Sequence, residues 1–577
     1  MNNAIQTPAD HWQELVGQID RHVQGKMGQM MGGISPIQTT LVYLDWLSHL
    51  MISPGKQLDV IKGTLEDAQD AAFKLMQADT QGGEPGRDDP RFASPGWQQW
   101  PYNLYAQGFQ VMERAWDRAT HGVPGLNHKS EDVATFAARQ WMDVFSPSNL
   151  PWLNPDVLKT TQTELGANLW RGSQNWLDDL HRIVHKLPPA GVEAFRVGES
   201  VAATPGKVVL RNDLIELIQY SPSTDKVYAE PILIVPAWIM KYYILDLSPH
   251  NSLVKYLVDQ GHTVFMISWK NPTSVDRNKG MEDYRVDGVM AAINTVSQIV
   301  PDRQIHSVGY CLGGTMLQIA AATMGREKDN RLASMTLFAA QGDFTEAGEL
   351  LLFINESEVN LIEAMMAETG VLQGSQMAGT FQLLHSNDLI WSRVLKDYML
   401  GLRDRPNDLM AWNADTTRMP YRMHSEYLHK LFLHNDLATG HYEVDGQPIW
   451  FTDIHVPCFA VGTVSDHVAP WKSVYKLHML PLDITFVLTS GGHNAGIVSE
   501  PGHPHRHFQI HHRPPQERYL APAQWQQQVP HQEGSWWPAW QNWLVSHSTG
   551  LVAPPATGLP GQKKKLPDAP GHYVLEH

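Results

Sequence analysis

The sequence predicts an α/β fold preceded by a mostly helical N-terminal domain. Short apolar runs such as Ile232–Val235 alternate with segments of helical length, which is typical of a parallel sheet covered on both faces. One of these runs, residues 304–308, leads into Gly309-Tyr310-Cys311-Leu312-Gly313-Gly314, and a helical pattern rich in Met, Leu and Ala follows. A strand, a glycine-flanked nucleophile and a helix make up a nucleophile elbow, so the α/β-hydrolase fold is expected.

Several apolar runs are predicted to form the strands of one sheet. They span residues 214–220, 232–235, 263–269, 304–308, 332–340, 458–464 and 484–489. Residues 344–449 are too long for a simple connection and mostly helical in pattern, so a cap above the elbow is expected there. The predicted domains are residues 1–200, mostly helical, and residues 201–577, the catalytic domain with its cap. Residues 552–570, rich in Pro and Gly, are expected to form a strap or an exposed tail.

The composition excludes several classes of protein. With 577 residues, 42% of them hydrophobic and 18% charged, the chain is expected to be globular with two domains. The net charge of −16 argues against nucleic acid as a partner. The two cysteines do not suggest a disulfide framework and favour a reducing cytosol. Residues 1–15 do not resemble a signal peptide, and no run is apolar and long enough for a transmembrane segment. No metal site is expected.

Asp466 and His493 complete a catalytic constellation in the order that this fold uses: nucleophile, acid, histidine. Asp466 follows one predicted strand, and His493 follows the last strand in a glycine-rich loop. Taken alone, each assignment has an alternative. Asp466 can cap a helix, and His467 competes with His493 for the role of the base. Adjacent residues point in different directions, so Asp466 and His467 are not expected to serve one nucleophile. Cys458, inside an apolar run, is expected to be an inert buried thiol.

A cysteine nucleophile suits a thioester substrate. Attack by the Cys311 thiolate on an acyl thioester gives another thioester, so the acyl group stays activated for a later transfer. A free thiol has a pKa of about 8.5, so His493 has to take its proton or hold it as an ion pair. The backbone N–H of Leu312 is expected to bind the oxyanion, with a second donor at Ala237 or Trp238 in the loop after residues 232–235.

Longer motifs of the chain resemble those of one enzyme family. They are the elbow at 309–314 and the runs at 145–149, 204–209, 211–220, 243–249, 251–254, 260–265, 267–269, 271–272, 388–391 and 412–418. Over residues 89–543 the chain resembles the polyhydroxyalkanoate synthases, bacterial enzymes that polymerise (R)-3-hydroxyacyl-CoA. The N-terminal region is similar to that of the single-subunit kinds, and residues 43–57 resemble the short-chain class I group.

The resemblance implies the residues of the site. The family's triad falls on Cys311, Asp466 and His493, and in this family the acid is also a candidate for activating the 3-hydroxyl of the incoming unit. No cofactor is implied, since CoA is part of the substrate and is released. Trp391 matches a cap tryptophan of the family, and Trp391, Tyr310 and Asn494 are expected substrate contacts. Asn494 stands where many members have Ile, and Ala237 and Met240 stand where many have Pro and Asn.

The resemblance also implies partners and a location. A homodimer is expected, in the cytoplasm and on the surface of polyester granules, with granule-associated proteins as candidate partners. Residues 1–200 combine apolar helical segments with a lack of chemical motifs, so they are expected to make these associations; plain structural support for the catalytic domain is the alternative.

Two other functions stay open at the level of sequence. A thioesterase or polyester depolymerase would use the same trio of residues with water as the acceptor. The cysteine and a cap large enough to exclude water argue against this function. A non-catalytic granule scaffold would not need an intact trio.

Overall fold

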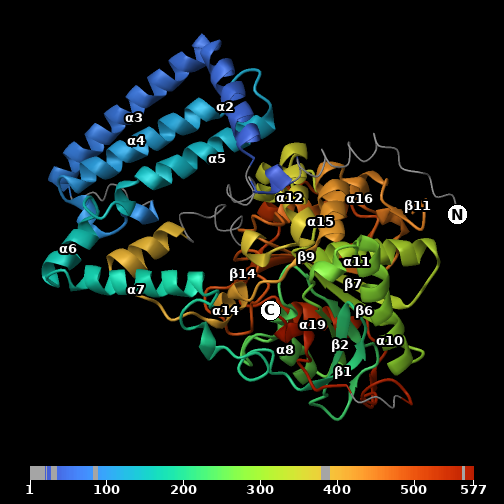
Figure 1. Cartoon of the computed structure of the whole chain (residues 1–577). Helices are drawn as coiled ribbons and strands as arrows, with labels where there is room; N and C mark the ends of the chain where they lie inside the picture. The colour runs from blue at the N-terminus through green and yellow to red at the C-terminus, as the bar shows by residue number, and fades with distance from the viewer. Residues whose placement is uncertain (1–19, 21, 27–34, 82–88, 378–389, 562–565) are drawn as a thin grey trace, which may run out of the picture. The chain divides into compact units, whose positions relative to one another are not determined.

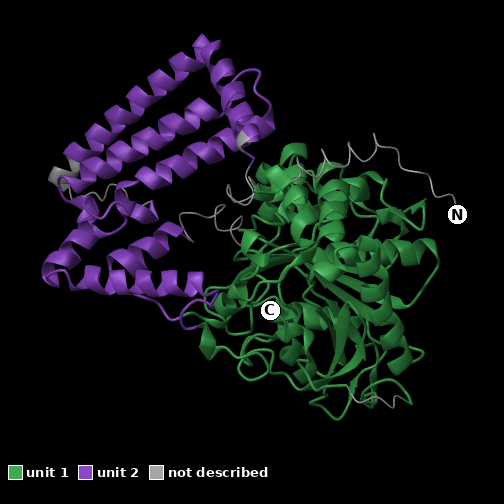
Figure 2. Cartoon of the chain, in the orientation of Figure 1, with its two compact units in different colours: residues 1–33, 192–377, 406–577 green, residues 34–191, 378–405 purple. Residues whose placement is uncertain are grey.

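The computed structural model describes residues 20, 22–26, 35–81, 89–377, 390–561 and 566–577 (Figure 1). The chain divides into two compact units (Figure 2). Unit 1 comprises residues 1–33, 192–377 and 406–577, and unit 2 comprises residues 34–191 and 378–405. Most of the expected cap therefore belongs to unit 1, whereas its middle segment is grouped with the helices that precede the catalytic domain.

In the described residues, unit 1 is built on a ten-stranded sheet with the order β1-β2-β5-β4-β6-β7-β12-β13-β14-β15. The strands are β1 (Gly206–Arg211), β2 (Ile215–Tyr220), β4 (Ile232–Val235), β5 (Val264–Trp269), β6 (Ile305–Tyr310), β7 (Leu332–Phe338), β12 (Cys458–Thr463), β13 (Ile484–Thr489), β14 (His507–Arg513) and β15 (His531–Glu533). The strands from β5 to β13 are parallel. The outer strands pair antiparallel at both edges.

The predicted strands correspond to β2, β4, β5, β6, β7, β12 and β13, with small differences at their ends. The expectation of a parallel sheet needs one correction, because β2 pairs antiparallel with β5. The outer strands β1, β14 and β15 were not predicted. β1 and β14 mix buried residues with half-buried and exposed ones, and β15 is exposed, so these strands lack the continuous apolar pattern that marks a central strand.

Two hydrophobic cores lie on opposite faces of the sheet. In β4, Leu233 and Val235 belong to one core, and Ile232 and Ile234 belong to the other. The first core includes residues of α10 (Ala291–Ile299) and α11 (Leu312–Arg326), and the second includes residues of α8 (Leu253–Asp259) and α19 (Trp537–Ser546) (Figure 1). Because successive side chains of a strand point to opposite faces, covering both faces requires an apolar residue at every position of β4.

Unit 2 is helical in its described residues. Its helices are α2 (Pro36–Met51), α3 (Pro54–Gln81), α4 (Tyr102–Thr120), α5 (His128–Phe145), α6 (Pro155–Thr163) and α7 (Ala167–Val184), and α3, α4 and α5 lie side by side (Figure 1). Residues 390–405 dock on α7 through Asp179, which accepts hydrogen bonds from Arg393 at 2.7 Å and Tyr398 at 2.8 Å. Arg403 forms an ion pair with the same carboxylate at 2.7 Å. Among the described residues, no helix is both long and apolar enough to cross a membrane.

Candidate active site

Cys311 lies at the sharp turn between β6 and α11. Its φ of 52° and ψ of −128° are values that residues other than glycine rarely adopt. The turn is tight enough that a Cβ on Gly309 would lie 2.3 Å from the Cα of Gly314. The N–H of Cys311 donates to the carbonyl of Phe338 in β7 at 2.9 Å. This strand–turn–helix geometry places the half-buried thiol at the carboxyl edge of the parallel strands.

Asp466 and His493 reach the same edge from two neighbouring strands. Asp466 follows β12, and His493 follows β13, which pairs parallel with β12. Nδ1 of His493 lies 2.8 Å from Oδ2 of Asp466. Cys311 is close enough that its charge contributes to the raised pKa of His493. The structure therefore brings together the three residues that the sequence singled out and connects Asp466 to His493 by a hydrogen bond.

The Asp466 carboxylate has a donor for each of its lone-pair directions. Oδ1 accepts the backbone N–H groups of Val468 at 2.9 Å and Ala469 at 2.8 Å. Oδ2 accepts the hydroxyl of Thr463 at 3.1 Å in addition to His493. The side chain is 0% exposed. Asp466 thus caps its own loop and orients the imidazole, and this saturation favours an orienting role over direct contact with a substrate hydroxyl.

The three groups set one another's charge. Burial lowers the pKa of His493, but the charges of Asp466 and Cys311 outweigh burial and hold that pKa well above 6.5. Burial raises the pKa of Asp466, but the charge of His493 and the hydrogen bonds to the carboxylate bring it below 3.8. The favoured arrangement of the pair is an imidazolium held by a carboxylate. A base oriented in this way beside a cysteine can take or hold the proton of the thiol.

The two competing residues lie elsewhere. The Nδ1 atom of His467 is 3.7 Å from a carboxylate oxygen of Glu349, and its side chain is 46% exposed. Cys458 is buried in β12, and burial raises the pKa of its thiol to about 12. The thiol of Cys458 therefore stays protonated at neutral pH, as an inert buried cysteine does.

The expected oxyanion donors lie on two backbones in direct contact. Leu312 is the first residue of α11, where N–H groups have no partner within the helix. The loop after β4 passes beside the next residue: a Cβ on Gly313 would lie 2.3 Å from the carbonyl oxygen of Val235 and 2.4 Å from that of Pro236. Ala237 and Trp238 follow directly, and both are buried. Only glycine at position 313 permits this approach.

The three expected substrate contacts do not all belong to the same unit. The Tyr310 hydroxyl donates to Oδ1 of Asn494 at 2.5 Å, and its ring lies 5.7 Å from that of His493, so Tyr310 and Asn494 contact each other beside the imidazole. Trp391 is half-buried in unit 2, within the segment that docks on α7, whereas the triad belongs to unit 1.

Sequence reasoning missed two residues of the site. Thr463, the last residue of β12, supports Asp466, and no local pattern distinguishes it from other strand threonines. Tyr427 ends the cap helix α15 (Tyr421–Tyr427). Tyr427 is buried, and the charge of Cys311 adds to burial in raising the pKa of its hydroxyl. A cap helix far along the chain gives no spacing signal that connects it to the elbow.

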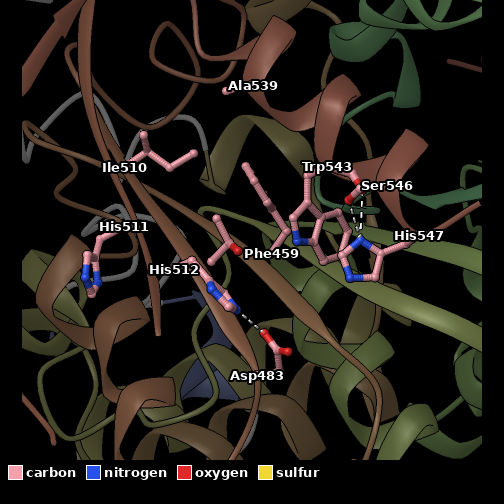
Figure 3. Close-up of a pocket in the computed structure, with 10 residues that line it drawn as sticks. Phe459, Asp483, Ile510, His511, His512, Ala539, Trp543, Ser546 and His547 are labelled. Carbon is pink, nitrogen blue, oxygen red and sulfur yellow. Dashed lines mark hydrogen bonds and ion pairs between the residues drawn. The ribbon is translucent and has the colours of Figure 1, made fainter. Parts of the chain in front are cut away.

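A cleft of about 490 Å³ lies at the amino ends of β12 and β13, and Figure 3 shows the residues that line it. It is lined by Phe459, Asp483, Thr485, Ile510, His511, His512, Ala539, Trp543, Ser546 and His547. Asp483 and His512 form an ion pair at 2.7 Å across it. None of the triad residues lines this cleft. In the described part of the chain, no group of three or more His, Cys, Asp or Glu side chains is arranged to hold a metal ion, and the absence of a cofactor stays a prediction.

Comparison with known proteins shows the family of the chain. The model of the N-terminus of poly-beta-hydroxybutyrate polymerase matches residues 88–257, a second N-terminal model of that polymerase matches residues 15–56, and the α/β-hydrolase fold model matches residues 230–500. A poly(3-hydroxyalkanoate) polymerase of Methylorubrum extorquens is 38% identical over 85% of this chain and 81% of its own length. The chain belongs to the poly(3-hydroxyalkanoate) polymerase family.

Other relatives agree with this assignment. The poly(3-hydroxyalkanoate) polymerase subunit of Rhizobium meliloti is 36% identical over 85% of this chain and 80% of its own length. That of Cupriavidus necator is 34% identical over 92% of this chain and 90% of its own length. The predicted family, the α/β-hydrolase fold and the assignment as an enzyme are confirmed. As a member of the poly(3-hydroxyalkanoate) polymerase family, the chain is an acyltransferase.

Proposed function

We propose that this enzyme polymerises (R)-3-hydroxyacyl-CoA into polyhydroxyalkanoate and releases CoA through a thioester on Cys311. The observation that carries the proposal is the constellation of Cys311 at a nucleophile elbow with the hydrogen-bonded pair His493 and Asp466, in a chain that belongs to a polymerase family. A thiolate held beside an imidazolium attacks a thioester carbonyl without a further base.

The loading step conserves the activation of the acyl group. The Cys311 thiolate attacks the carbonyl carbon, the N–H groups of Leu312 and the loop after β4 stabilise the oxyanion, and the bond to CoA sulfur breaks. The CoA thiolate takes the proton from His493. One thioester replaces another, so the step is nearly isoenergetic and the acyl group remains able to react with an alcohol.

The elongation step uses the same imidazole in its neutral form. His493 takes the proton of the 3-hydroxyl of an incoming acyl-CoA while that oxygen attacks the Cys311 thioester. An oxygen ester forms, the thiol of Cys311 is regenerated, and the longer chain, now a CoA thioester, reloads the cysteine. Each cycle forms one ester bond and releases one CoA.

The alternative is hydrolysis of the same intermediate by water, as in a thioesterase or polyester depolymerase. A serine ester would lose the driving force of the thioester, which suits hydrolysis, whereas a cysteine retains it for transfer. The cap residues over the elbow, including the buried Tyr427, favour exclusion of water.

Incubation of the full chain with (R)-3-hydroxybutyryl-CoA separates these functions. We expect CoA and polymer in stoichiometric amounts. Free 3-hydroxybutyrate with CoA would indicate a hydrolase, and no CoA release from folded protein would indicate a scaffold. Cys311→Ala is expected to abolish CoA release with the fold intact, and substantial turnover by this variant would contradict the proposal.

We further propose that unit 2 contacts the surface of the polyester granule in the cytoplasm. The support is a stripe on α3 formed by Leu58, Ile61, Leu65, Phe73 and Met76, which are 56–72% exposed. These positions share one helical face, since i, i+3 and i+7 coincide on a helix. An exposed apolar stripe of this length gains free energy on any apolar surface that it covers. The homodimer and granule-associated proteins are further proposed partners of this unit.

The matching test replaces the stripe in the full chain. The triple variant Leu58→Gln, Ile61→Gln, Leu65→Gln is expected to partition less to purified granules while it still loads Cys311. The control is Lys62→Gln with Glu66→Gln, which changes two exposed charged residues of the same helix and leaves every apolar side chain of the stripe in place. Unchanged partitioning of the triple variant would refute the contact, and sedimentation of both variants reports whether the same face forms the dimer.

A further inference from the structure

Side chains of the cap donate hydrogen bonds to the backbone of the loop after β4. Residues 236–243 carry the expected second oxyanion donor at Ala237 or Trp238. The Thr417 hydroxyl lies 2.7 Å from the carbonyl oxygen of Trp238 and 2.5 Å from that of Ile239. The indole N–H of Trp412 donates to the carbonyl of Lys241 at 2.7 Å. The backbone of this loop is therefore fixed at several of its residues.

Lys241 connects the same loop to a distant part of the chain. Its side chain is buried, with the residue only 3% exposed, and Nζ donates to the backbone carbonyl of Glu576. Asp415 lies nearby and accepts the Tyr243 hydroxyl at 2.9 Å. Burial lowers the pKa of Lys241, and the charges of Asp415 and Glu576 oppose this. Burying an ammonium group costs free energy unless it is paired. The hydrogen bond from Lys241 to Glu576 and the nearby carboxylates offset this cost.

The segment that receives Lys241 is itself firmly anchored. The N–H groups of His572 and Tyr573 donate to the buried Glu216 carboxylate of β2 at 2.7 and 3.0 Å. Val574 is 1% exposed. We call residues 572–576 the docked segment. The docked segment is therefore held by β2 as well as by its contact with the loop after β4.

Glu576 extends the connection to the loop after β5. Its carboxylate accepts the N–H of Asn271 at 3.1 Å, and its carbonyl accepts the side-chain amide of Asn271 at 3.2 Å. The side-chain oxygen of Asn271 in turn accepts the N–H of Arg418 at 3.0 Å. The docked segment therefore bridges two loops at the carboxyl edge of the sheet and, through Asn271, the cap.

We propose that Lys241 is a positioning residue for acyl transfer: by tethering the loop after β4 to the docked segment, it holds the second oxyanion donor against the elbow. The contact of this loop with Gly313 makes the donor position sensitive to any shift of the loop. Lys241 does not touch the thiol or its base. The inference rests on the proposed function, because it concerns the oxyanion of the loading step.

This role separates two reactions of one cysteine. Acyl loading passes through an oxyanion and needs both N–H donors. Alkylation of Cys311 by iodoacetamide needs the thiolate and His493 but forms no oxyanion. Loss of one oxyanion donor costs about 10²–10³ in rate in other enzymes, and a displacement of about 1 Å costs about 10². A loosened loop is expected to slow loading by about 10–100-fold and to leave alkylation unchanged.

The test compares Lys241→Met with Lys207→Met in the full chain. Lys207 forms an ion pair at 2.7 Å with Asp568, just before the docked segment and on the exposed side of β1, so it is a matched lysine that does not touch the loop. For each variant we measure the single-turnover CoA burst with (R)-3-hydroxybutyryl-CoA, the rate of Cys311 alkylation and the melting temperature. Glu576→Ala serves if Lys241→Met does not fold: it keeps the carbonyl that accepts Lys241 but removes the carboxylate whose charge favours the buried ammonium and which accepts the N–H of Asn271.

We expect a slowed burst with normal alkylation in Lys241→Met or Glu576→Ala, and wild-type values of both in Lys207→Met. A burst equal to that of the wild type in the folded variant would overturn the proposal. A parallel loss of burst and alkylation would also overturn it, because Lys241 would then support the whole site. Failure of the proposed function looks different, since the wild-type protein itself would release no CoA.

Discussion

Replacement of Asp466 by asparagine tests the division of labour within the triad. The new side chain would keep an oxygen for the N–H groups of Val468 and Ala469, but its NH₂ group would face the Nδ1–H of His493 and the Thr463 hydroxyl. Donors would then face each other, and the imidazolium would lose its carboxylate partner. In another triad, the same change costs about 10⁴ in kcat, which is about 5.5 kcal/mol of transition-state stabilisation.

Because the Asp466 side chain is fully buried and saturated with donors, it acts on both steps through His493. We expect the CoA burst and steady-state polymer formation to fall together, by about 10³–10⁴-fold. The assay is a rapid-quench burst compared with turbidity or ester formation at steady state. Asp329→Asn is the control: it removes a carboxylate that pairs with Arg331 at 2.6 Å, at the amino end of β7. A variant at position 466 that loads normally but polymerises poorly would refute this reasoning and make Asp466 the base for the hydroxyl.

Three further predictions concern the elbow, the second thiol and pH. Gly313→Ala is expected to slow the CoA burst, because its Cβ would lie 2.3 Å from a carbonyl oxygen of the adjoining loop; an unchanged burst would contradict the close approach. Cys458→Ala is expected to be as active as the wild type, and in the native protein iodoacetamide should leave Cys458 unlabelled at neutral pH, where its thiol stays protonated. Between pH 3.8 and 6.5 the His493–Asp466 pair is expected to contribute fully to the stability of the fold. This contribution is lost as pH rises through the raised pKa of His493, and it is also lost as pH falls through the lowered pKa of Asp466. Denaturation of the wild type and of His493→Gln at a series of pH values measures the difference in stability.

The sequence predicts the centre of this fold well because the central strands are buried on both faces. Continuous apolar runs as short as β4 and β13, bounded by polar or turn-forming residues, are typical of buried strands, and the glycines around Cys311 are required by close backbone contacts. The order nucleophile, acid, histidine then follows from which strands end at the same edge. The partly exposed strands β1 and β14 lack such a pattern and were found only in the structure.

Contacts between distant segments escaped prediction for a different reason. The docking of residues 390–405 on α7 depends on Asp179, one of many acidic residues in the chain. The tether between Lys241 and Glu576 joins residues more than three hundred positions apart. Spacing along a chain carries no information on such pairs, since only the folded backbone brings them together.

The most direct test of the central claim is the mass of the peptide that contains Cys311 after a single turnover. The wild-type protein is mixed with (R)-3-hydroxybutyryl-CoA, quenched in acid within the burst, digested and analysed. We expect a hydroxybutyryl adduct on Cys311 that hydroxylamine removes, in an amount equal to the CoA released, and no adduct on Cys458. Release of CoA with Cys311 unmodified, or an equal burst from Cys311→Ala, would contradict the thioester mechanism.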